Sequence, residues 1–439
     1  MGCVGDPNVA TPHLDRLAAE GVRFANACVT YPVCVPSRFT LMTGEYAHSR
    51  LVPTIGWRMS PAERTIAHVL GDAGYETAFI GKWHLFGAHP RGGPVLARKR
   101  GLTPTPRPFQ GGFQHWRGFE FRNDPFDTYY FRDGDPTPRR VEGYQTDGLF
   151  GLAERFIGQE HDVARPFFMV LSVEPPHFPL VAPESYLARW LGRDVTQAPN
   201  VPAEPDADRA AKRLDDLRRY YAMIENLDDN VGRLLRFLDE RGLHETTAVV
   251  FIADHGDLQG SHGLHGKQQP YEESVGVPFV VSWPAGGIAG GRVLPDVTCT
   301  EDWFPTLRGL AGLSARDGKP GLDLTPLMQG KVERTGREGV LLELVSELRP
   351  NAPFFADPWR GWRTERFKYT VKGDELDASG AQPWQLFDLE RDPYELTNLV
   401  DDPAYANTAA TLHGHLRATL AASHDDYSLA PALGHERYR

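Results

Sequence analysis

The chain has 439 residues, of which 41% are apolar and 24% charged, so it can bury a large core and form two or three domains. Its net charge of -11 includes no basic excess, which argues against a nucleic-acid partner because phosphate binding needs clustered Lys and Arg. It contains no run of about twenty apolar residues, so we expect no membrane span.

The first ten residues have neither the basic nor the apolar region of an export signal. A cytoplasmic location is therefore the default expectation, and an incomplete N-terminus would leave the compartment open. Four cysteines are too few and too scattered for a disulfide framework, and they form no CxxC pair; they are Cys3, Cys28, Cys34 and Cys299. This usage favours one cysteine with special surroundings.

Helical patterns alternate with short apolar runs along the chain. Helices are predicted over residues 12–20, 63–74 and about 214–241, and buried strands over residues 76–80, 167–173, 248–253 and 277–283. This alternation indicates an α/β fold with a mainly parallel sheet. Polar residues directly after these strands would lie at the carboxyl edge of the sheet, where such folds place their sites.

Residues 87–148 are rich in Gly, Pro and aromatic residues and show no clear period. They could form a surface insertion that packs on itself, a lid over a substrate site, or both. From about Val345 the chain changes to short strands and turns, followed by a helical pattern over residues 409–421. We therefore predict a large domain over residues 1–344 and a smaller α+β subdomain over residues 345–439.

The sharpest motif is CVPSR at residues 34–38, followed by FTLMTG. Pro36 is tolerated in the first turn of a helix, which puts Cys34 just ahead of a helix N-terminus. Such a position favours anions and lowers the pKa of a thiol. Arg38, one turn further on, can offer a planar set of donors to an oxyanion.

This motif resembles the signature of the type I sulfatases, members of the alkaline phosphatase superfamily. The resemblance implies that a formylglycine-generating enzyme oxidises Cys34 to formylglycine, whose hydrated aldehyde is the nucleophile. It also implies an alkaline-phosphatase-like fold, in which helices flank a mixed, mainly parallel sheet. Further similar segments extend the match from Asp6 to about Asp426; they are TPHLDRLAAEGVRFANA, GKWH, PPHFPL, ADHGDLQGSHGLHGKQQPYEESVGVPF and LFDLERDPYELTNL.

The resemblance assigns roles to four further residues. It implies that Lys82 contacts sulfate and the formylglycine, and that His84 is the base that takes a proton from the diol when sulfate is expelled. It also implies that Lys267 clamps the sulfate and that His177 protonates the leaving oxygen, although a stiff Pro-rich turn would equally explain this histidine.

Asp254 and His255 directly follow the predicted strand 248–253. A helix cap and a surface histidine would be the ordinary explanation. The resemblance makes them ligands of a divalent cation together with the modified Cys34. We expect calcium, with magnesium or manganese left open because imidazole ligation broadens the choice. His262 and His265 are expected in a loop near the substrate, without an assigned role.

One feature of the family is missing. Its members typically begin with an apolar strand that ends in two adjacent aspartates, both metal ligands, and no such pair lies near Met1. Asp6 and Asp15 do not replace it. We therefore expect a truncated start, an interior strand absent from the sheet, and weak metal binding by the chain as given.

The expected function is hydrolysis of sulfate monoesters, with a sulfated small molecule or carbohydrate as substrate. The alternatives are a phosphate or phosphonate monoester hydrolase on the same scaffold and a non-catalytic descendant that binds anions or sugars. The aromatic stretch 109–144 hints at a surface that stacks on sugar or other rings.

Overall fold

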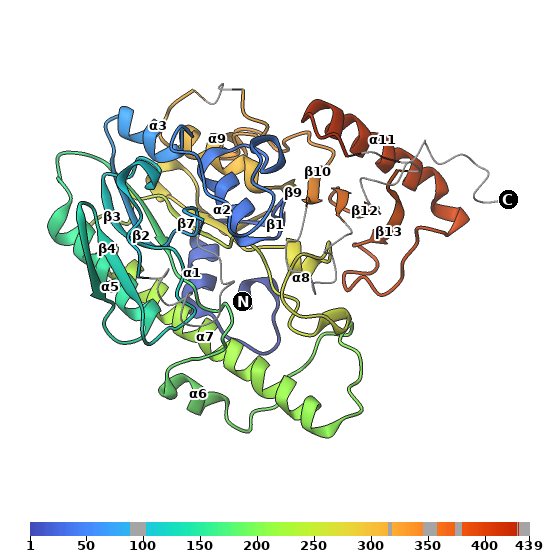
Figure 1. Ribbon diagram of the computed structural model, residues 1–439, viewed down its shortest axis with the longest axis horizontal. Coiled ribbons are helices and arrows are strands. Elements are labelled where there is room, and N and C mark those ends of the chain that lie inside the picture. The colour runs from blue at the N-terminus through green and yellow to red at the C-terminus, as the bar shows by residue number, and fades with distance from the viewer. Residues whose placement is uncertain (88–101, 315–317, 346–357, 374–379, 428, 430–439) are drawn as a thin grey trace.

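The computed structural model describes residues 1–87, 102–314, 318–345, 358–373, 380–427 and 429 (Figure 1). Its strands are β1 Val22–Ala27, β2 Glu76–Lys82, β3 His115–Phe119, β4 Tyr129–Arg132, β5 Asp135–Arg140, β6 Phe167–Ser172, β7 Val249–Ile252, β8 Phe279–Ser282, β9 Arg292–Thr298, β10 Val340–Leu344, β11 Trp359–Arg363, β12 Phe367–Lys372 and β13 Gln382–Asp388. Its helices are α1 Pro12–Glu20, α2 Cys34–Thr43, α3 Ile66–Asp72, α5 Gln145–Arg155, α6 Glu184–Trp190, α7 Ala207–Glu240, α8 Glu272–Val275, α9 Trp303–Leu310, α10 Thr325–Met328 and α11 Ala406–Ala422.

The first sheet has the order β5-β4-β3-β2-β6. Strands β3 and β6 run parallel to β2, while β4 and β5 add antiparallel pairs at one edge. Every residue of β2 is buried, as its apolar run predicts. The segment predicted as a surface insertion therefore supplies three strands of this sheet, and only residues 88–101 of it lie outside the described part.

The second sheet has the order β7-β8-β1-β9. Strand β8 is antiparallel to both β7 and β1, and β1 is parallel to β9. The predicted strands 248–253 and 277–283 correspond to β7 and β8. Together the two sheets confirm the mixed α/β fold. Among the described strands, β2 is parallel to its two neighbours and β1 is parallel to β9, whereas the other four pairs of these sheets are antiparallel, so the sheets are less parallel than the sequence analysis expected.

A cavity of about 1450 Å³ separates the two sheets where β6 and β7 form their edges. Each residue of β6 and β7 is only partly buried, in contrast to β2. The cavity is lined by side chains of these two strands and of α7, including Leu171, Val173, Val249, Phe251 and Leu234. Among the described residues no strand pairs with the free edges of β6 and β7, and the cavity lies between these edges.

The helix α7 covers this cavity on one side. Its apolar face is largely buried, and Leu227, Val231 and Leu235 belong to a core cluster that also contains residues of the second sheet. The helix begins before the predicted residue 214, because the Asp206 side chain accepts a hydrogen bond of 2.9 Å from the Arg209 amide and caps it.

The C-terminal part forms an antiparallel sheet, β10-β11-β12-β13, covered by α11 (right in Figure 1). This sheet and helix confirm the smaller α+β subdomain. The first strand of the sheet is β10, at residues 340–344, and the domain division at residue 345 stays a prediction.

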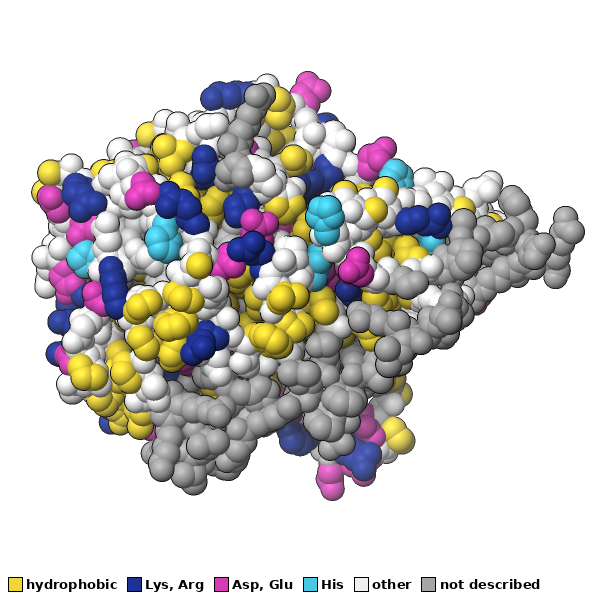
Figure 2. All heavy atoms as spheres, turned by 45° about the horizontal axis from the view of Figure 1, so that its top comes forward, with side chains coloured by type: hydrophobic (Ala, Val, Ile, Leu, Met, Phe, Trp, Pro, Cys, Tyr) yellow, Lys and Arg dark blue, Asp and Glu magenta, His cyan; other side chains and the backbone are white. Residues whose placement is uncertain are grey.

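The surface carries charges of both signs. On the face seen in Figure 2, Lys and Arg side chains alternate with Asp and Glu instead of forming a continuous basic band. Within the described ranges, no helix has both the length and the apolar composition needed to span a lipid bilayer.

Candidate active site

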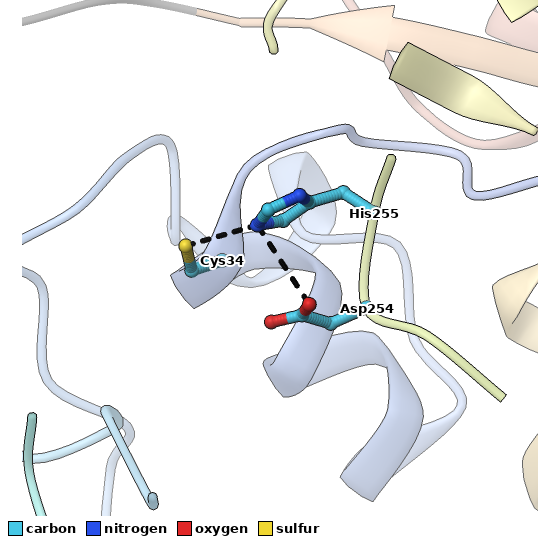
Figure 3. Close-up of side chains that lie close together, drawn as sticks. All are labelled: Cys34, Asp254 and His255. Carbon is cyan, nitrogen blue, oxygen red and sulfur yellow. Dashed lines mark hydrogen bonds and ion pairs between the residues drawn. The ribbon is translucent and has the colours of Figure 1, made fainter. Parts of the chain in front are cut away.

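Cys34 is the first residue of α2, and its thiol is 1% exposed. Lys267 Nζ donates to Cys34 Sγ at 3.0 Å, and His255 Nε2 lies 3.1 Å from the same sulfur (Figure 3). Extended Val33 precedes the helix, so the sequence expectation of a cysteine at a helix N-terminus is met. The sulfur stands where formylglycine would carry its hydroxyl groups.

The surroundings of Cys34 are strongly electropositive. Burial alone would raise the pKa of the thiol, but the positive charges of Lys267, His255 and Lys82 lower it well below the usual value. The site therefore stabilises a negative charge at the position of Cys34 Sγ. A site that binds anions needs this property.

This environment predicts unusual reactivity of the unmodified thiol. We expect alkylation of Cys34 by iodoacetamide to reach its maximal rate well below the pH of about 8.5 at which a free cysteine is half ionised. The rate falls as pH drops through the lowered pKa, since only the thiolate reacts. Lys267→Met should shift the profile toward higher pH, and an unchanged profile would contradict this description of the site.

Asp254 and His255 lie in the loop directly after β7 and face Cys34 (Figure 3). One ligand atom from each of the three residues lies within 4.8 Å of the other two. His255 Nδ1 donates to the Gly256 carbonyl at 2.8 Å, so Nε2 faces the cluster and offers a lone pair once it has lost its proton. These residues offer a carboxylate, an imidazole and the Cys34 side chain, whereas calcium takes about six to eight oxygen ligands. The described cluster thus fits part of a cation site.

Arg38 contacts protein groups on three elements. Its Nε forms an ion pair of 2.7 Å with Asp254 Oδ2, and its Nη1 donates at 2.8 Å both to the Lys82 carbonyl and to Ser172 Oγ. Burial would raise the pKa of Asp254, but Arg38 and His255 hold it well below the usual range. Arg38 therefore ties α2 to the ends of β2, β6 and β7, a positioning role that the sequence analysis did not include.

Lys82, at the end of β2, is paired with a carboxylate that the sequence analysis missed. Its Nζ lies 3.7 Å from Glu174 Oε1, and both side chains are 3% exposed. Glu174 also accepts hydrogen bonds from the Arg122 amide and from Gln145 Nε2. Burial would raise the pKa of Glu174, but Lys82 and these donors lower it. The position of Glu174, just beyond an apolar run, was the available signal.

Removing Glu174 should therefore destabilise the chain. We expect Glu174→Gln to lower the free energy of unfolding by roughly 3 kcal/mol, because it leaves the ammonium of Lys82 buried without its counter-charge. Glu154→Gln, which breaks the half-exposed pair with Arg233, should change it by less than about 1 kcal/mol. Denaturant unfolding of both variants measures the difference, and equal effects would show that the buried pair is not stabilising.

His84 is buried next to this group, with a left-handed φ of 58°. Neither ring nitrogen has a hydrogen-bond partner among the described residues. Burial lowers its pKa to about 4, although the nearby Cys34 opposes this shift. A neutral imidazole beside Cys34 is suited to accept a proton.

His177 and Lys267 complete the cluster. His177 Nδ1 donates to the Phe178 carbonyl at 2.6 Å, so Nε2 can accept from Lys267 Nζ at 3.3 Å. His262 instead stacks on Tyr271, with ring centroids 3.7 Å apart, which gives it a structural contact. All eight predicted site residues thus lie in one group around Cys34, Arg38 and Asp254; the other five are Lys82, His84, His177, His255 and Lys267.

The predicted ring-binding stretch is largely an interior feature. Trp116, Phe119, Phe121 and Phe131 are at most 4% exposed, and their rings pack in the core. Phe126, at 42% exposed, is an exception. Buried rings cannot stack on a ligand, so the structure does not support that hint for most of the stretch.

Fold and site together define an α/β enzyme of the alkaline phosphatase superfamily, and comparison with known proteins gives its family. The sequence profile described as Sulfatase matches residues 1–313, and the profile described as N-sulphoglucosamine sulphohydrolase, C-terminal, matches residues 260–422. The chain belongs to the sulfatase family of enzymes.

Similar proteins span most of the chain. An ulvan-active sulfatase of Formosa agariphila is 31% identical over 433 residues, covering 97% of this chain and 79% of that protein. An N-acetylglucosamine-6-O-sulfatase of Bacteroides thetaiotaomicron is 25% identical over 95% of this chain and 83% of its own length. The crystal structure of the yidJ sulfatase from Bacteroides fragilis matches with a TM-score of 0.85 at 27% identity, covering 97% of this chain and 93% of that one.

Proposed function

We propose that this sulfatase hydrolyses sulfate monoesters through a formylglycine derived from Cys34. The observation that carries the proposal is the position of Cys34, buried at a helix N-terminus with Lys267 at 3.0 Å and His255 at 3.1 Å. Formylglycine, once formed, supplies a hydrated aldehyde whose hydroxyl can form a bond to sulfur, and a formylglycine-generating enzyme is the partner that this requires.

The remaining residues act on charge and protons. Lys267 and Lys82 offset the negative charge of the transferring group, since their ammonium groups surround the sulfur position. His177 lies against Lys267 and, when its Nε2 carries a proton taken from solvent, delivers that proton to the leaving ester oxygen. His84, neutral and without a hydrogen-bond partner, takes the proton released when the diol collapses and expels sulfate.

A divalent cation would be held by Asp254, His255 and the modified Cys34, and calcium is the proposed ion. When bound, it supplies Lewis-acid stabilisation to the sulfate oxygens. The described donors include one carboxylate only, so we expect the chain as given to bind the ion weakly.

The substrate that we propose is a sulfated carbohydrate. The support is the similarity to a protein named N-acetylglucosamine-6-O-sulfatase, which covers 95% of this chain. A panel of sulfated mono- and oligosaccharides, compared with an aryl sulfate, tests this step. Higher kcat/KM on a sugar sulfate supports it, and turnover restricted to the aryl sulfate contradicts it.

The phosphate or phosphonate monoester alternative is tested by its preferred substrate. With formylglycine at position 34 and calcium present, we expect turnover of an aryl sulfate to exceed that of the matching aryl phosphate by at least about tenfold. The reverse ratio would favour the alternative, and no turnover of either ester would favour the non-catalytic one.

A further inference from the structure

The segment at residues 264–275, between β7 and β8, consists of a loop and helix α8; it carries Lys267 into the site and also contacts the C-terminal sheet. Trp359, the first residue of β11, is 0% exposed, and its indole Nε1 donates to the main-chain carbonyl of Gln268 at 2.9 Å. The main chain one residue beyond Lys267 is therefore held by a residue that lies 91 positions further along the sequence.

The hydrogen bond from Trp359 is made to a residue with a strained backbone. Gln268 has a φ of 83°, in the left-handed region that residues other than glycine adopt at an energetic cost, and it is 5% exposed. Such a conformation persists only where tertiary contacts impose it. The adjacent Lys267 then reaches Cys34 Sγ at 3.0 Å and His177 Nε2 at 3.3 Å.

A second hold lies four residues further on. Glu272 accepts from Arg363 Nη2 at 3.1 Å and from Lys368 Nζ at 3.0 Å, and its own amide donates to Glu395 Oε2 at 2.7 Å. All three partners belong to the C-terminal part of the chain. Residues 268–272 are thus fixed at both ends by the C-terminal sheet and the loop that follows it. Of the contacts described here, the one from Trp359 is the nearest in sequence to Lys267.

We propose that Trp359 is a positioning residue that acts through the Gln268 carbonyl to hold the Lys267 ammonium against the reacting group. The C-terminal sheet then contributes to sulfate transfer through the position of Lys267. The role of Lys267 in turnover rests on the proposed function, whereas its contact with Cys34 does not.

The test uses Trp359→Phe, which removes the indole donor and keeps an aromatic ring. In the full chain with unconverted Cys34 and EDTA present, we expect alkylation of Cys34 at neutral pH to slow at least about threefold, toward the rate of Lys267→Met. The matched control is Trp362→Phe on the same strand, because Trp362 Nε1 has no hydrogen-bond partner within the described residues. The control should keep the wild-type rate.

A rescue separates positioning from general loosening. Because glycine adopts a left-handed φ without strain, Gln268→Gly combined with Trp359→Phe should recover part of the lost alkylation rate. General destabilisation by the smaller ring would not be reversed in this way. If Trp359→Phe does not fold, benzothienylalanine at position 359 replaces the N–H by sulfur with nearly the same shape and makes the same test.

Turnover gives an independent readout in the formylglycine form. There, Trp359→Phe should lower kcat roughly tenfold and change KM less, since Lys267 acts on the transferring group. If the wild type does not turn over sulfate esters but the variants still differ in alkylation rate as expected, the proposed function is contradicted and the positioning role of Trp359 is still supported. If Cys34 in Trp359→Phe is alkylated at the wild-type rate, or if Trp362→Phe slows alkylation as much as Trp359→Phe does, the proposal is overturned.

Discussion

A strand supplied to the cavity between β6 and β7 is expected to stabilise the chain markedly. The fusion protein would begin with about six apolar, β-branched residues, followed by two aspartates and a linker that joins Met1. Met1 itself lines this cavity. Burying about four apolar side chains contributes roughly 1.5–3 kcal/mol each, and with two sets of strand hydrogen bonds this exceeds the ordering cost of about 1–2 kcal/mol per residue. The unfolding temperature should rise by roughly 5 °C or more.

The same fusion should strengthen cation binding. Its two carboxylates would enter the site from the carboxyl end of the new strand, next to Asp254, and add the oxygen ligands that the described cluster lacks. We expect calorimetry to show calcium affinity at least about tenfold above that of the unfused chain. An Asn-Asn version should keep the thermal gain and lose the gain in affinity. No thermal gain from the apolar strand would contradict the assignment of the cavity as a strand site.

Replacing the proposed nucleophile should have the largest effect on activity. Relative to the strand-completed protein with formylglycine at position 34, Cys34→Ala should lower kcat for an aryl sulfate by at least about 10³-fold, because no hydroxyl remains to attack sulfur. The matched control is Cys28→Ala. Cys28 is also buried, but its sulfur donates to the Thr298 carbonyl at 3.2 Å, whereas Lys267 and His255 contact Cys34. Comparable activity in Cys34→Ala would exclude the proposed mechanism.

The strands that flank the site could be predicted because their burial leaves a direct mark on the sequence. Residues 76–80, 167–173, 248–253 and 277–283 are short apolar runs, and each corresponds to an observed strand. The strands after residue 101 were harder to predict, since β3, β4 and β5 are rich in Gly, Pro, Arg and aromatic residues. They gain their stability from a chain of pairings in which β3 pairs with β2, β4 with β3 and β5 with β4. Pairing between strands, rather than local composition, determines the secondary structure of this segment.

Some site residues could likewise be predicted from local sequence and others could not. Cys34 was predicted from its motif and its helix, whereas the roles of the lysines and histidines came from the resemblance to a family. Glu174 and Ser172 were missed, because their function depends on β2 and β6 lying side by side. Gln268 and Trp359 are 91 residues apart in sequence, so no local pattern indicates their contact.

The central claim is that Cys34 becomes the formylglycine of a sulfate ester hydrolase. The most direct measurement is peptide mass spectrometry of Cys34 in the strand-completed protein, produced together with a formylglycine-generating enzyme, combined with an assay of inorganic sulfate released from an aryl sulfate. We predict the aldehyde mass at Cys34, with sulfate release in proportion to the converted fraction. Sulfate release by protein in which Cys34 remains a thiol, or full conversion without release in the presence of calcium, would contradict the claim.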